Sequence, residues 1–178
     1  MQSGLAVLRG FEACLGIVDS GAGDELDFGE TWTVENVSLG GLGASVPSRA
    51  PAAAIGDLLA LQPGGGENWL IGVVRRFSRS SDGRAQIGVE TVSRQATPIS
   101  LRRRGGSGYV VGGGQPAALL DMPGDDDSVC ILVPATFFDF KESYDSKLDG
   151  KSILLSPVEL IESGADFQIG RYKLLYAD

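Results

Sequence analysis

The sequence predicts an all-β protein built from two small domains. Of its 178 residues, 26 are glycine and 8 are proline, so turns are frequent and the elements between them are short. Apolar runs of strand length alternate with turn sequences along most of the chain. Charge is divided unevenly, because residues 1–105 contain 10 basic and 11 acidic side chains whereas residues 106–178 contain 5 and 12. These observations favour two β-domains with different surfaces.

The domain boundary is expected in the stretch RRRGGSGYVVGGGQP. Two glycine clusters there flank Tyr109, Val110 and Val111, a composition typical of a linker. We therefore assign residues 1–104 to a first β-barrel domain, residues 105–116 to a glycine-rich linker and residues 117–178 to a small acidic β-domain.

Strand signals dominate the first domain. TWTVENVS and LGGLGASV, which together cover residues 31–46, are predicted to form a hairpin around a glycine turn. Further strands are expected at residues 55–62, 69–79 and 86–93, because the turn sequences PGGGEN and SSDGRA separate them. Five or six short strands at this spacing predict a small antiparallel barrel. Its inward side chains are expected to be Trp32, Val34, Leu70, Val73 and Val89.

Two other segments of the chain allow more than one interpretation. Residues 10–18 fit a short helix, since Phe11, Leu15 and Val18 recur at helical spacing, but they fit a strand nearly as well. In the second domain, the runs PAALLDM, SVCILVPATFF, KSILLSPVELIES and FQIGRYKLLY predict strands. Within the third run, SPVELIES could instead form one helical turn that begins at Ser156.

The composition argues against most catalytic and metal sites. The sequence has no histidine, which excludes Ser-His-Asp catalysis and histidine-ligated zinc, and we predict that the protein is not an enzyme. Cys14 and Cys130 lie far apart in the sequence, so they are expected to be buried, unpaired thiols without a metal or cofactor. The residues Asp125, Asp126 and Asp127 lack the spacing of a calcium loop and predict a solvated turn. The net charge of −8 argues against a nucleic-acid partner.

Targeting signals are also missing from the sequence. No apolar run reaches the length of a membrane span, and the first 18 residues do not have the pattern of a signal peptide. We therefore expect a cytoplasmic protein. The chain enters apolar sequence almost at once, at Leu5, which is consistent with a piece of a larger chain.

The predicted hairpin carries a short polar motif, Asn36-x-Ser38-x-x-Gly41. This motif resembles the [D/N]-x-S-x-x-G signature of PilZ domains, the bacterial receptor modules for cyclic di-GMP. The strand sequences that follow, including IGDLLALQ, WLIGVVRRFSR and QIGVETVS, are similar to the PilZ pattern as well. The resemblance covers about residues 30 to 101. It implies a PilZ-like barrel that acts in bacterial signalling.

The resemblance implies that Asn36, Ser38 and Gly41 bind the nucleotide. Asn36 and Ser38 would contact the edge of a base, and Gly41 would allow close backbone approach. Positions 36 and 38 share one face of a strand because side chains alternate with a period of two. The alternative is a turn in which both side chains bond their own backbone.

The sequence departs from the family in its arginines. PilZ receptors have an R-x-x-x-R pair before the motif, and these arginines hold phosphates and stack on guanine. Here Arg9 is the only arginine before Asn36, and neither Leu5 nor Ala13 completes a pair. Two explanations remain open: the pair lies before Met1, or the domain is degenerate and binds no nucleotide.

Other arginines could replace the missing pair. Arg75 and Arg76 are neighbours in a predicted strand, so they should point to opposite faces and only one should reach a given site. A second cluster, Arg102 to Arg104, follows the predicted barrel. The alternative for both groups is solvated surface charge near a linker. The favoured function is recognition of cyclic di-GMP, with the phosphate-binding arginine pair supplied from outside this chain or missing. The candidate ligand-binding residues are Asn36, Ser38, Gly41, Arg75 and Arg76. The alternative is a nucleotide-independent adaptor that binds another protein.

Overall fold

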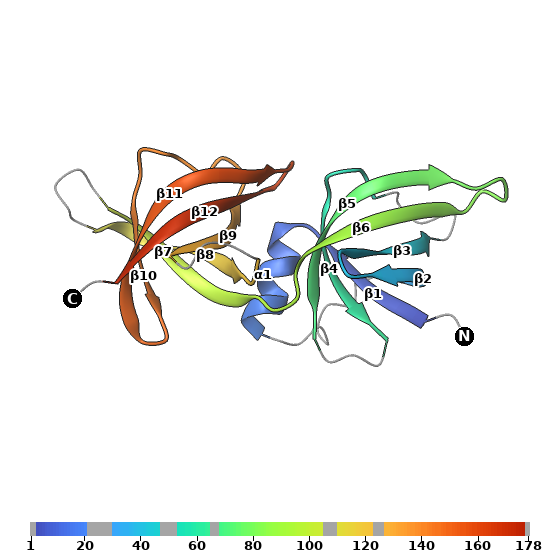
Figure 1. Cartoon of the computed structure of the whole chain (residues 1–178), viewed down its shortest axis with the longest axis horizontal. Helices are drawn as coiled ribbons and strands as arrows, with labels where there is room; N and C mark the ends of the chain where they lie inside the picture. The colour runs from blue at the N-terminus through green and yellow to red at the C-terminus, as the bar shows by residue number, and fades with distance from the viewer. Residues whose placement is uncertain are drawn as a thin grey trace. The chain divides into compact units, whose positions relative to one another are not determined.

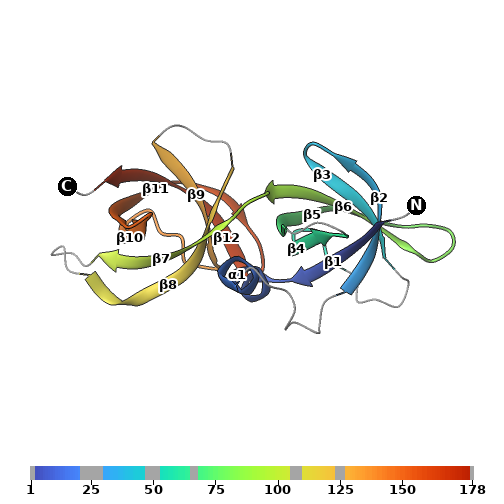
Figure 2. The ribbon, with the colours of Figure 1, turned by 90° about the horizontal axis from the view of Figure 1, so that it is seen from below.

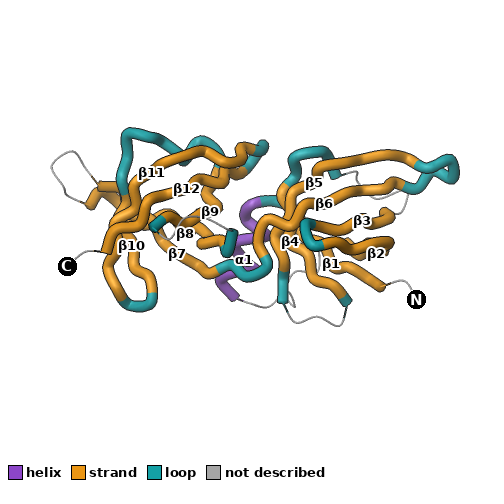
Figure 3. Tube along the Cα trace, viewed as in Figure 1, coloured by secondary structure: helices purple, strands orange, loops and turns teal. Residues whose placement is uncertain are grey.

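The structure, a computed structural model, describes residues 3–20, 30–46, 53–64, 68–104, 110–122 and 127–176. Over these residues the chain forms one helix and twelve strands (Figures 1 and 3). It divides into two compact units, Met1–Gln95 and Ala96–Asp178. Each unit contains a closed antiparallel barrel of six strands. The predicted all-β class, with a first barrel and a second β-domain, is confirmed.

The barrel of the first unit closes in the strand order β1-β2-β3-β6-β5-β4 (Figure 2). The hairpins β2/β3 and β5/β6 lie side by side because β3 pairs with β6. The first strand was not predicted, and it closes the barrel by pairing with both β2 and β4. The bounds of these strands are β1 Ser3–Arg9, β2 Glu30–Ser38, β3 Gly41–Val46, β4 Leu58–Pro63, β5 Leu70–Arg79 and β6 Ala85–Ser93.

Helix α1, Phe11–Ser20, settles the open interpretation of residues 10–18 in favour of a helix. It begins after Gly10, whose φ of 95° is readily available only to glycine. The helix packs on β1 and β4. Its buried side chains are Phe11, Cys14 and Ile17, so the buried face lies beside the one that Leu15 and Val18 would have formed.

The core of the first barrel confirms most of the predicted inward side chains. Trp32 and Val89 belong to the buried cluster, and Val34 and Leu70 pack against it. Val73 is buried but is not part of this cluster, which contains its neighbour Val74 instead. The prediction for Val73 was therefore wrong in its direction, because neighbouring residues of a strand point to opposite faces.

The second unit is a barrel with the strand order β10-β11-β12-β9-β8-β7. Two tyrosines, Tyr144 and Tyr172, are fully buried in its core beside aliphatic side chains. The bounds are β7 Thr97–Arg104, β8 Val110–Leu120, β9 Ser128–Pro134, β10 Tyr144–Leu148, β11 Lys151–Ser163 and β12 Phe167–Tyr176.

The boundary between the units lies earlier than the sequence suggested. The chain divides between Gln95 and Ala96 rather than after residue 104, so β7 and its three arginines belong to the second unit. Of the predicted linker at residues 105–116, residues 110–116 lie in β8, and the rest falls outside the described residues. Glycine-rich sequence was mistaken for a linker because β8 itself contains three consecutive glycines and still pairs with β7.

The alternative of a helical turn at SPVELIES is wrong. These residues continue β11, which pairs with β12 along its length. Pro157 is accommodated next to a register shift between Pro157 and Glu159, and a second shift follows between Leu160 and Glu162. Proline is tolerated at such irregularities because the regular ladder is already interrupted there.

Two further predictions concern the cysteines and membrane-spanning segments. Cys14 and Cys130 are buried and are not joined in a disulfide, as predicted from the sequence. Among the residues that the structure describes, no helix is long and apolar enough to cross a membrane.

Candidate functional site

The motif residues lie at the tip of the β2/β3 hairpin. Ser38 pairs with Gly41, which leaves Leu39 and Gly40 as a two-residue turn. The end of β6 holds this turn in place. The Thr91 amide donates a hydrogen bond to the Gly40 carbonyl at 2.9 Å, and Arg94 Nη2 donates to the Leu39 carbonyl at 2.8 Å. The motif is therefore fixed to the barrel before any ligand binds.

A β-bulge decides which way the motif residues point. The pairing of β2 with β3 shifts between Val34 and Asn36, so Glu35 is an additional residue in β2. Without this residue, Trp32 and Asn36 would share a face, because both positions are even. The bulge reverses the alternation. Trp32 lies in the core, whereas Asn36 and Ser38 are exposed on the outer face of the barrel.

Two of the three motif residues already have structural roles. The Ser38 hydroxyl donates a hydrogen bond to the Gly41 carbonyl at a long distance of 3.4 Å. A side chain at Gly41 would collide with the backbone carbonyl of Val89 in β6. Gly41 is thus required by the pairing of β3 with β6. The Ser38 hydroxyl keeps its acceptor lone pairs for another partner.

Four residues form one row across four neighbouring strands. Asn36 of β2 pairs with Gly43 of β3, Gly43 pairs with Gly88 of β6, and Gly88 pairs with Arg76 of β5. Directly paired residues point to the same face, so this row lies on the outer face together with Ser38. The topology therefore brings Asn36 and Arg76, which are far apart in the sequence, to one surface.

The two candidate arginines share that surface, which corrects the expectation that they point to opposite faces. A second bulge lies between Val74 and Arg76 in the pairing of β5 with β6, and Arg75 is the additional residue. Arg75 forms an ion pair with Glu90 at 3.3 Å, while the Arg76 side chain lies over Gly88. Gly88 and Glu90 are two positions apart on β6 and face the same way.

Acidic side chains also reach this outer face. Glu35, the bulged residue of β2, accepts a hydrogen bond from Gln86 Nε2 at 3.3 Å, and Glu90 pairs with Arg75. Gln86 and Glu90 were not predicted as site residues from the sequence. The alternation of side chains in β6 could have identified them. Ile87 and Val89 point inward, so Gln86, Gly88 and Glu90 lie on the outer face.

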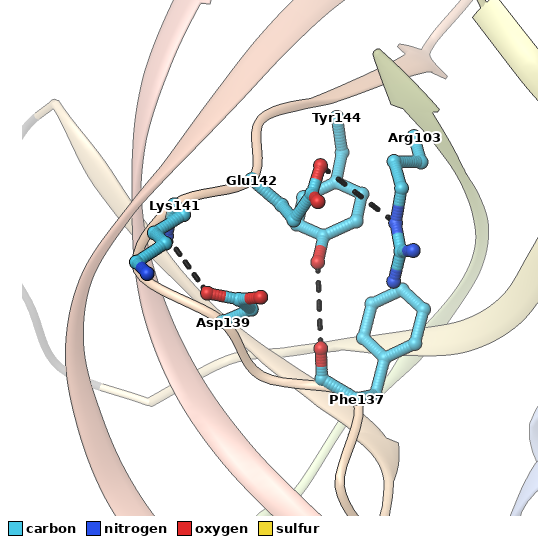
Figure 4. A network of polar contacts seen from close by, with 6 residues as sticks. All are labelled: Arg103, Phe137, Asp139, Lys141, Glu142 and Tyr144. Atoms are coloured by element: carbon cyan, nitrogen blue, oxygen red, sulfur yellow. Dashed lines mark hydrogen bonds and ion pairs between the residues drawn. The ribbon is translucent and has the colours of Figure 1, made fainter. Parts of the chain in front are cut away.

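The other arginine cluster is used within the second barrel. Arg104 Nε lies 2.8 Å from Asp145 Oδ2, and Arg103 Nε lies 3.7 Å from Glu142 Oε2. Figure 4 shows Arg103 and Glu142 beside Tyr144, whose hydroxyl donates to the Phe137 carbonyl at 3.4 Å. Burial raises the pKa of Tyr144. These contacts account for Arg103 and Arg104 as structural residues of this unit.

Within the described parts of the chain, neither surface carries a cluster of metal ligands. Among the described residues, no group of three or more cysteine, aspartate or glutamate side chains could hold a metal ion. Asp125 and Asp126 of the acidic turn lie outside the described residues, so the predicted solvated turn stays a prediction.

Comparison with known families finds a match within the first unit. Residues 29–98 match the family model described as the cyclic-di-GMP receptor FimW, middle PilZ domain. Over these residues the chain is similar to a PilZ domain. The match includes the motif, both bulges and the row from Asn36 to Arg76. It confirms the resemblance seen in the sequence.

Two solved structures cover the chain more widely but resemble it only distantly. One, titled MrkH, a novel c-di-GMP dependence transcription regulatory factor, is 9% identical with a TM-score of 0.34, and the alignment covers 99% of this chain and 78% of that one. The other, MrkH from K. pneumonia, is 8% identical with a TM-score of 0.31, with 99% and 79% covered. A search of curated proteins found no match.

Proposed function

We propose that the first unit binds cyclic di-GMP on the outer face of β2, β3, β6 and β5. The observation that carries the proposal is the convergence of Asn36, Ser38 and Arg76 on one face of a PilZ domain. Two bulges place these side chains outside, while their strands fill the core. A receptor for a doubly charged dinucleotide needs polar groups for the base edges and cations for the phosphates.

Each candidate residue has a role in this proposal. The Asn36 amide and the Ser38 hydroxyl offer hydrogen bonds to a base edge, and Gly41 keeps the hairpin close to β6. Arg75 and Arg76 supply positive charge to the ligand in place of the R-x-x-x-R pair, which the sequence lacks before Asn36. The bulge supports this substitution because it brings both guanidinium groups to the same face.

The proposed role is that of a receptor in bacterial signalling and not of an enzyme. The ligand is a signal that is bound and released, and no cofactor is required. Cys14 and Cys130 are buried thiols that are not joined in a disulfide, which supports a reducing compartment such as the cytoplasm.

The test is calorimetric titration of the chain with cyclic di-GMP. Losing one charge-assisted contact costs about 1.5–3 kcal/mol, so Arg76→Ala should weaken binding by about 10- to 150-fold. Arg84→Ala is the matched control, because it removes the same charge at the exposed β5/β6 turn. Equal affinity of the two variants would refute the assignment of Arg76. No heat of binding by the unaltered chain would refute the receptor function.

The second candidate is a protein adaptor that binds no nucleotide. Three observations favour it. The Ser38 hydroxyl is bonded to Gly41 within its own hairpin, and Gly41 is explained by close packing against Val89. Arg75 is already paired with Glu90. If the chain fails to bind cyclic di-GMP, these contacts explain the motif as a structural device and the adaptor function takes precedence.

A further inference from the structure

The paired glycines at the centre of the outer face do not belong to the Asn36-x-Ser38-x-x-Gly41 motif. Gly43 and Gly88 face each other across β3 and β6, with Asn36 on one side and Arg76 on the other. Glycine is unfavourable inside a strand because it adds no side-chain packing and loses much conformational freedom. Neither residue has a positive φ that would require glycine. Their presence side by side therefore needs another explanation.

The space above both glycines is occupied by planar groups from the neighbouring strands. A Cβ atom added at Gly43 would lie 2.8 Å from Asn36 Oδ1 and 2.9 Å from Asn36 Nδ2. A Cβ atom added at Gly88 would lie 2.8 Å from Arg76 Nε and 3.3 Å from Arg76 Nη2. Strand side chains normally stand upright on the sheet. Here the amide and the guanidinium lean over the glycines from opposite sides.

We propose that Asn36, Gly43, Gly88 and Arg76 form a stacking platform for one purine base of the ligand. The guanidinium plane stacks well on aromatic rings and carries a positive charge that the face of a ring attracts. Every nucleobase offers such a face. The two glycines keep the guanidinium low on the sheet, so the base lies above it, and Arg75 contacts a phosphate once its ion pair with Glu90 opens. This inference rests on the proposed function.

The glycines allow a test that removes no ligand-binding group. Gly88→Ala introduces one methyl group under Arg76, which should lift the guanidinium from the sheet. Gly43→Ala should do the same to the Asn36 amide. Both displaced side chains are exposed and can rotate into solvent, so the fold should tolerate the changes. Gly16→Ala in α1 is the matched control, because a Cβ there has no neighbour within 4 Å.

Calorimetric titration with cyclic di-GMP gives the decisive comparison. Gly88→Ala should weaken binding about tenfold, the scale of one stacking contact, while Gly16→Ala leaves the affinity unchanged. Arg76→Lys, which keeps the charge and loses the plane, should weaken binding similarly and should reduce the loss of guanine ultraviolet absorbance that accompanies stacking.

The outcomes separate this inference from the proposed function. If the unaltered chain binds and Gly88→Ala binds equally well, Arg76 acts as a flexible cation and the platform is refuted while the receptor function stands. If Arg76→Lys keeps full affinity and the full absorbance change, the platform is refuted as well. If the unaltered chain does not bind cyclic di-GMP, both proposals are overturned. Thermal unfolding of each variant checks that the barrel is intact.

Discussion

In the proposed site, Glu90 competes with the anionic ligand for the guanidinium of Arg75. Their ion pair spans 3.3 Å on the outer face of the first barrel, two positions along β6 from Gly88. For Arg75 to contact a phosphate, this pair must open. Glu90→Gln removes the carboxylate charge and keeps the size of the side chain. We therefore expect this substitution to strengthen the binding of cyclic di-GMP.

The structure sets the magnitude of this effect. The side chains of Arg75 and Glu90 are 36% and 53% exposed, so water screens their attraction. Exposed ion pairs contribute about 0.2–1 kcal/mol. Releasing Arg75 should therefore lower the dissociation constant by about 1.5- to 5-fold. Loss of repulsion between Glu90 and the phosphates acts in the same direction, and both effects should shrink as salt is added.

Calorimetric titration at low and high salt measures the effect. Glu12→Gln is the control, since Glu12 is an exposed acid in the first turn of α1 and the net charge changes equally. Stronger binding by Glu90→Gln alone, with the difference reduced at high salt, is the expected result. Equal strengthening by both variants would mean that net charge is responsible. Weaker binding by Glu90→Gln would show that Glu90 itself contacts the ligand, and the competition argument would be refuted.

The remaining predictions concern the hairpin and the second barrel. Ser38→Ala should lower the free energy of unfolding by about 0.5 kcal/mol, because the bond to Gly41 is long, and should weaken nucleotide binding by about 1–2 kcal/mol; thermal unfolding with and without cyclic di-GMP measures both. Gly41→Ala should destabilise the first barrel by about 1–3 kcal/mol, measured by urea unfolding, because its methyl group meets the rigid Val89 backbone. Tyr172→Phe should leave stability equal or higher by up to about 1 kcal/mol, since the buried hydroxyl has no hydrogen-bond partner in the described residues; a clear loss would show a partner. Burial raises the pKa of Tyr172, so the folded state favours the neutral phenol, and the stabilisation present below pH about 10 should disappear as the pH rises further; thermal unfolding from pH 8 upward should show a smaller loss for Tyr172→Phe.

The sequence predicted the elements of the first barrel better than the directions of its side chains. Turn residues and apolar runs located the β2/β3 and β5/β6 hairpins, because both signals are local. A bulge is a single additional residue with no required composition, so nothing in TWTVENVS or VVRRFS indicates one. Strict alternation therefore separated Arg75 from Arg76 and could not explain how Trp32 and Asn36 face opposite ways.

Other differences come from pairing between distant segments. Strand β1 is held by β2 and β4, and the glycine-rich start of β8 is held by β7. Pairing with such partners outweighs the low intrinsic tendency of glycine to form strands, which is why the predicted linker lies partly in a strand. The sequence alone indicates part of the role of Gly88, since a glycine inside a strand pattern predicts close approach of another group. That an arginine would fill the space became clear only from the register of β5 and β6.

The closure of both barrels limits how another protein could recognise this chain. Strands in an open sheet present unpaired amides and carbonyls along the edge, and an extended peptide can bind there as an additional strand. Over the described residues, each of the two sheets returns to its own first strand, so no strand is an edge along its whole length. A partner of the adaptor alternative is therefore expected to recognise mainly side chains on the curved exterior or in the turns. Substitutions of surface residues alone, without changes to backbone pairing, should then be enough to redirect its choice of partner.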